Sequence, residues 1–203
     1  MTNSCSRTAL NKAVQVLQQG GIVAYPTETY YGLGVDPFNE RALQRLFQLK
    51  KRSLHKPILV LVEQAADVDL LASTIPADFQ TLISNFWPGA LTLVFPAHSS
   101  VPAMLTGGTG TVGIRQSPHP CAQRLLKYMQ GPVTGTSANL SGEVPATTAR
   151  QVEQMFGNRI DYILNGGTTP GGQGSTLVGF DKKIFCIRQG KIPFAHIQSQ
   201  VSE

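Results

Sequence analysis

The sequence lacks the cysteine pattern of two common protein classes. Its 203 residues include only three cysteines, Cys5, Cys121 and Cys186, which are widely spaced and form no CxxC pair. This spacing argues against a disulfide framework and against a zinc ribbon. We therefore expect reduced thiols in a cytoplasm.

Long hydrophobic runs are also missing. No segment approaches the roughly 20 apolar residues of a membrane span, and the amino terminus has no apolar stretch behind a basic start. We expect a soluble, cytoplasmic protein that is neither exported nor membrane-bound.

Familiar nucleotide and metal motifs are absent. No GxxxxGK[ST] sequence is present, which excludes a P-loop. Residues 108–113 spell GxGxxG, but they lead into a predicted strand instead of joining a strand to a helix, so they are not a dinucleotide fingerprint. The histidines show no metal-ligand spacing, and we predict no dedicated metal site. Mg²⁺ carried by ATP would need few protein ligands.

Charge is scarce and unbalanced. Only 14% of the residues are charged and 41% are hydrophobic, so the chain can bury a sizeable core. We expect one domain over residues 1–203, with its core at about 8–190. The 17 Lys plus Arg against 12 Asp plus Glu give a net charge of +5, which favours an anionic ligand such as a nucleotide or RNA.

Hydrophobic periodicity alternates between helices and strands along the whole chain. Apolar residues at helical spacing and capping residues predict helices at 8–19, 40–50, 64–72, 77–86, 119–130 and 148–156. Short apolar runs predict strands at 22–25, 58–62, 91–95, 111–115, 132–136, 162–164, 175–178 and 184–188. Pro26 and the glycines that follow predict a loop to residue 34. This alternation predicts an α/β domain with an open, twisted, mixed sheet flanked by helices.

Three cations cluster where the second predicted helix ends. Lys50, Arg52 and Lys56 lie within seven residues, and one interpretation is a solvated helix end that complements the helix dipole. The other is a phosphate clamp, because Arg grips phosphate oxygens bidentately and Lys supplies point charges.

Small polar residues follow the strand predicted at 132–136. Residues 137–142 read Ser-Ala-Asn-Leu-Ser-Gly, which suits either an ordinary turn or a cradle of backbone amides and hydroxyls around phosphate. Ser137 as a nucleophile is disfavoured, because the GxSxG elbow is missing.

Two further features suggest a small polar ligand. Thr27, Glu28, Thr29 and Tyr31 form a loop at a strand end, where a rigid sheet positions functional side chains. Arg115 ends an apolar strand and is the best single candidate for binding a carboxylate, its alternative being a buried ion pair.

Taken together, these motifs resemble the Sua5/YrdC/TsaC family, the threonylcarbamoyl-AMP synthases of the tRNA t6A pathway. The similarity runs along nearly the whole chain. Residues 25–34 resemble the family motif PTETxYGLG, residues 50–56 resemble KxR with a following lysine, and residues 86–91 resemble WPGPLT. Residues 137–142 resemble SANxSG, residues 174–176 resemble the ST turn, and residues 187–190 resemble RPG. Residues 111–115 and 119–120 also match the family. Three residues depart from the family pattern: Leu61 stands where some members have a His, Gly174 replaces a Glu and Gln189 replaces the Pro of RPG.

The resemblance implies a YrdC-like fold with a large concave cavity and a specific reaction. L-Threonine, bicarbonate and ATP would give L-threonylcarbamoyladenylate and pyrophosphate, and the product would pass to partner proteins that modify tRNA. By position, threonine would be held by Thr29, Arg115 and Ser175. The ATP site would comprise Lys50, Arg52, Lys56, Thr111, Ser137, Asn139, Pro145 and Arg188, with Lys50, Arg52, Ser137 and Asn139 as the catalytic set. Because the chain stops soon after Arg188, we expect the short YrdC/TsaC form.

Two other interpretations stay open at this point. A non-enzymatic module that binds tRNA or double-stranded RNA fits the positive charge, although no RNP or KH motif supports it. A carbamoyl-transfer domain like the YrdC-like part of hydrogenase maturation proteins is the third, but the acylphosphatase and zinc-finger-like segments of those proteins are absent from this sequence.

Overall fold

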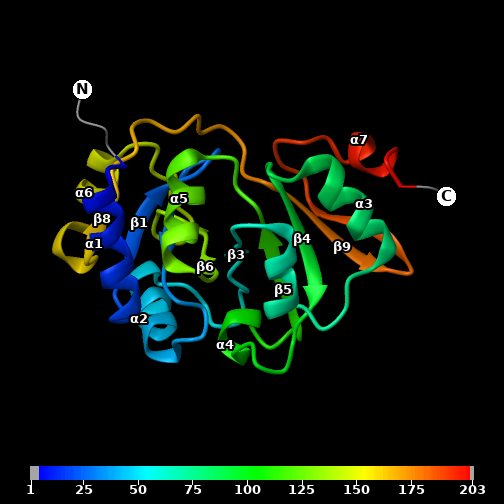
Figure 1. Ribbon diagram of the computed structural model, residues 1–203, viewed down its shortest axis with the longest axis horizontal. Coiled ribbons are helices and arrows are strands. Elements are labelled where there is room, and N and C mark those ends of the chain that lie inside the picture. Colours follow the sequence, from blue (N-terminus) through cyan, green and yellow to red (C-terminus); the bar gives the residue numbers. More distant parts are fainter. Residues whose placement is uncertain (1–4, 202–203) are drawn as a thin grey trace.

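The strands form two mixed sheets that lie side by side (Figure 1) in the computed structural model, which describes residues 5–201. The smaller sheet has the order β7-β2-β1-β8 and consists of β1 (Val23–Pro26), β2 (Tyr31–Gly34), β7 (Thr136–Ser137) and β8 (Tyr162–Ile163). The larger has the order β10-β9-β4-β5-β3-β6 and consists of β3 (Val60–Leu61), β4 (Leu91–Pro96), β5 (Thr111–Arg115), β6 (Val133–Thr134), β9 (Thr176–Asp181) and β10 (Lys183–Arg188). Each sheet contains parallel and antiparallel pairs. The predicted α/β class is confirmed, with two sheets where the sequence predicts one.

Gly135 marks the point where the chain passes from one sheet to the other. The strand predicted at 132–136 is two strands, of which β6 pairs with β3 and β7 pairs with β2. A Cβ atom on Gly135 would lie 2.8 Å from Leu59 Cδ1 and 2.9 Å from Leu61 Cγ. Glycine therefore permits the backbone to pass close to Leu59 and Leu61 as it leaves the larger sheet, so that Ser137 lies in the smaller sheet.

The predicted loop before residue 34 is wrong in its second half, which is strand β2. Gly32 and Gly34 supply close packing there, since a Cβ on Gly34 would lie 2.6 Å from Val133 Cγ1 and 2.7 Å from Tyr25 Cε1. The actual turn is therefore short, and it presents Thr27 and Thr29 at the end of β1.

The helices follow the predicted pattern closely. They are α1 (Arg7–Gln18), α2 (Glu40–Lys50), α3 (Ala77–Phe86), α4 (Ala103–Thr106), α5 (Pro120–Met129), α6 (Ala149–Phe156) and α7 (Phe194–Gln198). Asn39 caps α2 by accepting a hydrogen bond from Ala42 N at 3.1 Å, and Thr148 and Gln151 form a capping box on α6. The segment predicted as a helix at 64–72 is a 3₁₀ helix over Ala65–Leu70, and a second 3₁₀ turn covers Gly157–Arg159. Two short helices, α4 and α7, were not predicted.

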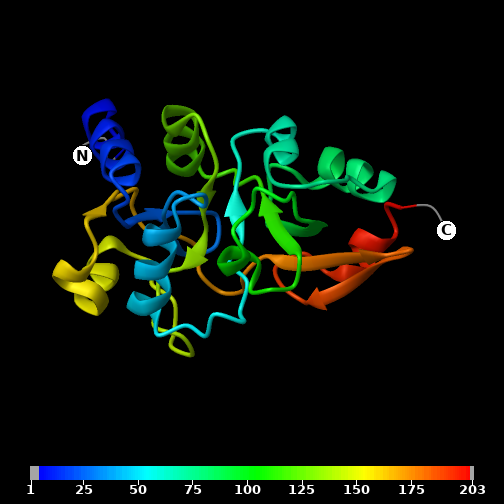
Figure 2. The same ribbon diagram turned by 90° about the horizontal axis from the view of Figure 1, so that it is seen from below.

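Helices cover both faces of the smaller sheet (Figure 2). Val23 and Tyr25 of β1 pack in a cluster with α1 and α5, whereas Ala24 packs in a larger cluster with α2 and α6. Figure 2 shows these two helix pairs on opposite sides of β1. The alternation of side chains along β1 thus fixes which helices each face buries.

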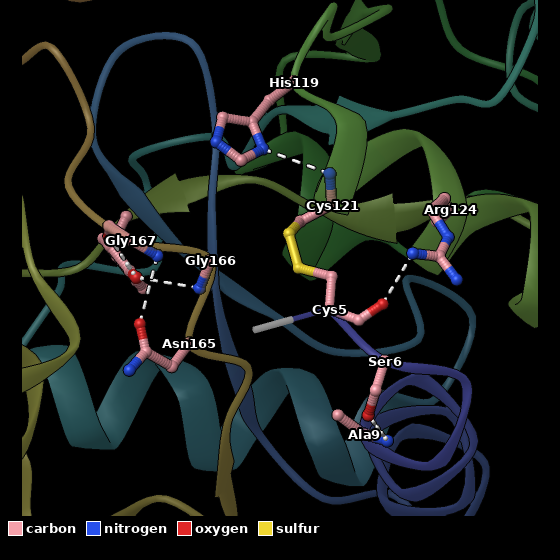
Figure 3. Close-up of a disulfide and its surroundings, with 10 residues drawn as sticks. Cys5, Ser6, Ala9, His119, Cys121, Arg124, Asn165, Gly166 and Gly167 are labelled. Atoms are coloured by element: carbon pink, nitrogen blue, oxygen red, sulfur yellow. Dashed lines mark hydrogen bonds between the residues drawn. A yellow bond between two sulfur atoms is a disulfide. The ribbon is translucent and has the colours of Figure 1, made fainter. Parts of the chain in front are cut away.

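The expectation of reduced thiols is wrong for two of the cysteines. Cys5 and Cys121 form a disulfide (Figure 3), and their Cα atoms are 5.8 Å apart. They lie 116 positions apart in the sequence and meet because α1 packs against α5, whose first turn contains Cys121. The sulfurs lie against Gly166, where a Cβ would stand 2.6 Å from Cys121 Sγ. Cys186 remains a free thiol. Across residues 5–201, none of the helices combines the length and the apolar character required to cross a membrane.

Candidate active site

A cavity of about 780 Å³ is lined by residues from both sheets. The smaller sheet contributes β2 and β7, and the larger contributes β4, β5, β9 and β10. The predicted site residues that line it are Thr29, Arg52, Lys56, Thr111, Arg115, Ser137, Pro145, Ser175 and Arg188. Lys50 and Asn139 are not among its lining residues. The fold therefore brings together most of the side chains that the sequence motifs singled out.

Positive charge dominates this cavity. Arg52, Lys56, Arg115 and Arg188 line it, and among the described residues no Asp or Glu does. Burial lowers the pKa of the Arg52 guanidinium, and nearby Arg188 lowers it further. The pKa of Arg188 is lowered in the same way, by burial and then by Arg115. These cations repel one another across a partly dehydrated space, which an anionic ligand would relieve.

Backbone carbonyls fix the direction of Arg52. Its Nε donates to Lys56 O at 3.1 Å and its Nη2 donates to Pro57 O at 2.8 Å. These bonds close the loop after α2 and use two of the five N–H donors of a guanidinium that lines the cavity. Arg188 is held on the other side, where its Nη2 donates to Ser175 O at 3.1 Å.

Lys50 is buried and turned toward the segment 137–139. Its Nζ donates to Ser137 O, to Asn139 O at 2.7 Å and to Asn139 Oδ1 at 3.3 Å. Burial, and to a smaller extent the charge of nearby Arg52, lowers the pKa of Lys50 to about 7. Lys50 therefore stabilises the turn at 137–139 through hydrogen bonds, whereas Arg52 and Lys56 line the cavity itself.

Asn139 organises the same turn from within. Its Oδ1 accepts a hydrogen bond from Ser137 Oγ at 2.6 Å, and its Nδ2 donates to Glu143 O at 2.7 Å and Leu140 O at 2.9 Å. Ser137 lines the cavity beside Pro145. The segment at 137–142 is thus a hydrogen-bonded turn in which Ser137 lines the cavity.

A buried ion pair lies at the end of β5. Arg115 Nη1 is 3.2 Å from Glu28 Oε1, and the Oε2 atom of Glu28 accepts a hydrogen bond from Ser117 Oγ. Arg115 Nε is buried and has no hydrogen-bond partner among the described residues. Arg115 therefore forms the ion pair that was one of its two interpretations and also lines the cavity, while its binding of a carboxylate stays a prediction.

Hydroxyl pairs complete the site. Thr27 Oγ1 and Thr29 Oγ1 are 3.1 Å apart at the end of β1, and Thr92 Oγ1 and Ser175 Oγ are 2.8 Å apart on the larger sheet. Sequence reasoning missed Thr92, although a threonine within the apolar run of β4 was a usable signal. It also missed Ser117, for which the sequence offered none.

The three departures from the family pattern have different surroundings. Leu61 is fully buried in the core cluster with α1 and α5, next to Gly135. Gly174 and Gln189 both line the cavity. The amide nitrogen of Gln189 is occupied by the backbone, since Nε2 donates to Gly190 O at 3.0 Å and to Ile192 O at 2.9 Å. Within the described residues, no group of three His, Cys, Asp or Glu side chains could hold a metal ion.

The fold and the cavity define a two-sheet α/β protein with a cation-rich site for a small anionic ligand. The family model Sua5_yciO_yrdC, described as telomere recombination, matches residues 15–190. The chain belongs to this Sua5/YciO/YrdC family.

Curated relatives and solved structures agree with this assignment. A threonylcarbamoyl-AMP synthase of Coxiella burnetii is 40% identical over 162 residues, covering 80% of this chain and 87% of the relative. One from Pyrococcus abyssi is 35% identical over 192 residues, covering 94% of this chain but only 56% of the relative. The crystal structure of P. abyssi Sua5 complexed with L-threonine has a TM-score of 0.92 at 34% identity, covering 96% of this chain and 57% of that one. E. coli YciO shares the fold, with a TM-score of 0.84 at 23% identity.

Proposed function

We propose that this chain is a threonylcarbamoyl-AMP synthase, a nucleotidyltransferase that converts L-threonine, bicarbonate and ATP into L-threonylcarbamoyladenylate and pyrophosphate. One observation carries the proposal: a single cavity combines Arg115, a second group of cations and neutral hydroxyls. This set suits a substrate carboxylate and a polyphosphate at the same time. The names of the relatives support the same reaction.

Each substrate has a region of the cavity. The guanidinium of Arg115 receives the threonine carboxylate, and the Thr29 and Ser175 hydroxyls bind its other polar atoms. The phosphates of ATP are bound by Arg52, Lys56 and Arg188 together with the turn at Ser137. The remaining ATP contacts are assigned to Thr111 and Pro145, while Lys50 and Asn139 act on ATP by shaping that turn.

The chemistry needs no protein nucleophile. The amine of threonine attacks carbon dioxide, which dehydration of bicarbonate supplies, and loses a proton to give a carbamate. A carbamate oxygen then bonds to the α-phosphorus of ATP, and the bond from that phosphorus to the β-phosphate oxygen breaks, releasing pyrophosphate. The cations around Arg52 stabilise the charge that develops on the phosphates, and the cavity aligns the two reactants.

Further expectations concern metal, partners and compartment. Mg²⁺ enters with ATP, because the cavity lining offers no carboxylate ligand and phosphates with water suffice. The product passes to t6A-pathway proteins that act on tRNA, and residues 1–203 work as one YrdC-like domain. We place this activity in the cytoplasm.

Calorimetric titration with L-threonine tests the assignment of Arg115. We expect binding by the unaltered protein and at least tenfold weaker binding by Arg115→Gln, since a charged hydrogen-bonding pair is lost. Arg150→Gln, on the exposed side of α6, is the matched control and should bind normally. Equal affinity in Arg115→Gln, or binding of tRNA without any binding of threonine and ATP, would reject the proposal in favour of another ligand.

A further inference from the structure

Glu28 contacts the site from outside the cavity. Its carboxylate is mostly buried and is not part of the cavity lining. One oxygen, Oε1, pairs with Arg115 Nη1 at 3.2 Å, and the other accepts a hydrogen bond from Ser117 Oγ. Ser117 is itself fully buried. Glu28 is thus held by a hydrogen bond at Oε2 and by the ion pair at Oε1, which has no hydrogen-bond partner among the described residues.

The Glu28 contact determines which part of Arg115 remains free. A guanidinium group is planar and offers its donors in fixed directions, so occupying Nη1 leaves the edge formed by Nε and Nη2. The Nε atom on that edge is buried and has no hydrogen-bond partner among the described residues. Because Nε is enclosed by protein, Nη2 is the donor on this edge that is left for a substrate carboxylate, with which it would form a charge-assisted hydrogen bond.

We propose that Glu28, anchored by Ser117, is a positioning residue that orients the guanidinium of Arg115 toward the substrate carboxylate. This inference rests on the proposed function and adds a determinant of amino-acid binding to it. Glu28 also keeps the buried guanidinium paired while the site is empty. Removing Glu28 should therefore weaken threonine binding, while ATP binding through Arg52 and Ser137 stays intact.

Separate titrations with L-threonine and with ATP test this role. We expect Glu28→Gln to raise the Kd for threonine at least tenfold and to change the Kd for ATP less than twofold. Ser117→Ala should raise the threonine Kd about threefold, because Glu28 then keeps only one contact. Since both residues act through Arg115, the double variant should bind threonine within twofold of Glu28→Gln alone. Glu153→Gln, exposed on α6, is the matched control.

The outcomes separate positioning from general support of the fold. Unchanged threonine affinity in Glu28→Gln, or equal losses for threonine and ATP, would overturn the inference. If Glu28→Gln does not fold, Ser117→Ala decides by the same threonine-to-ATP comparison. Arg115→Gln distinguishes failure of the proposed function from failure of the role of Glu28. If threonine binding is lost in Arg115→Gln but kept in Glu28→Gln, the proposed function stands and the role of Glu28 is rejected. If the unaltered protein binds no threonine, the proposed function fails and this inference fails with it.

Discussion

Replacing Lys50 with methionine separates a lysine that supports a turn from a lysine that contacts phosphate. The ammonium group donates to three oxygens, but two of them keep another donor. Ser137 O also accepts from Asn139 N at 3.0 Å, and Asn139 Oδ1 accepts from Ser137 Oγ at 2.6 Å. Only Asn139 O loses its donor, and one unpaired buried carbonyl costs about 1–3 kcal/mol. Methionine keeps the packing of the stem, so we expect Lys50→Met to lower the free energy of unfolding by about 2 kcal/mol.

Urea unfolding and ATP titration of Lys50→Met measure the two consequences separately. We expect the stability loss together with at least tenfold weaker ATP binding, because the turn that presents Ser137 is no longer held. Lys51→Met, an exposed neighbour at the end of α2, should change neither quantity. Unchanged or higher stability combined with lost ATP binding would refute this reasoning and place the Lys50 ammonium on the phosphates.

Two further predictions concern the disulfide and proton uptake. Reduction of Cys5–Cys121, or Cys121→Ser, should lower the free energy of unfolding by about 2–4 kcal/mol, since the bond closes a long loop. Urea unfolding with and without reductant measures this loss, with Cys186→Ser as the control. Identical unfolding curves in the two conditions would contradict the prediction. Because the pKa of Lys50 is lowered to about 7, this residue is mostly neutral at pH 8 in the free protein. Bound phosphates raise that pKa, so ATP binding should take up a proton and weaken as the pH rises from 7 to 9. Calorimetry in buffers of different ionisation enthalpy should detect the uptake, and its persistence in Lys50→Met would disprove the assignment to Lys50.

Local signals in the sequence predicted the helices well. Asn39 and Thr148 cap their helices as their residue types suggest, because capping involves atoms only a few positions apart. Strand pairing depends on distant residues, and so the division into two sheets at Gly135 was not predictable from periodicity. The disulfide was missed for the same reason, since Cys5 and Cys121 meet only through the packing of α1 on α5.

The candidate site shows the same division between local and distant information. Lys50 shares the buried face of α2 with Leu43 and Leu46, and this helical spacing was a signal that its ammonium would be enclosed. The ion pair of Arg115 with Glu28 joins the end of β5 to the turn between β1 and β2, and no local signal identified Glu28 as the partner. Sequence motifs therefore located the side chains of the cavity, while their partners emerged only from the fold.

Pyrophosphate release from ATP and bicarbonate, measured with and without L-threonine, tests the proposed synthase activity at its chemical step. Arg52→Ala is the informative variant, because Arg52 lies among the cavity cations and is held by two loop carbonyls. We predict release that requires threonine and falls strongly in Arg52→Ala. ATP binding without any threonine-dependent release would contradict the proposed reaction and show that the cavity binds a nucleotide for another purpose.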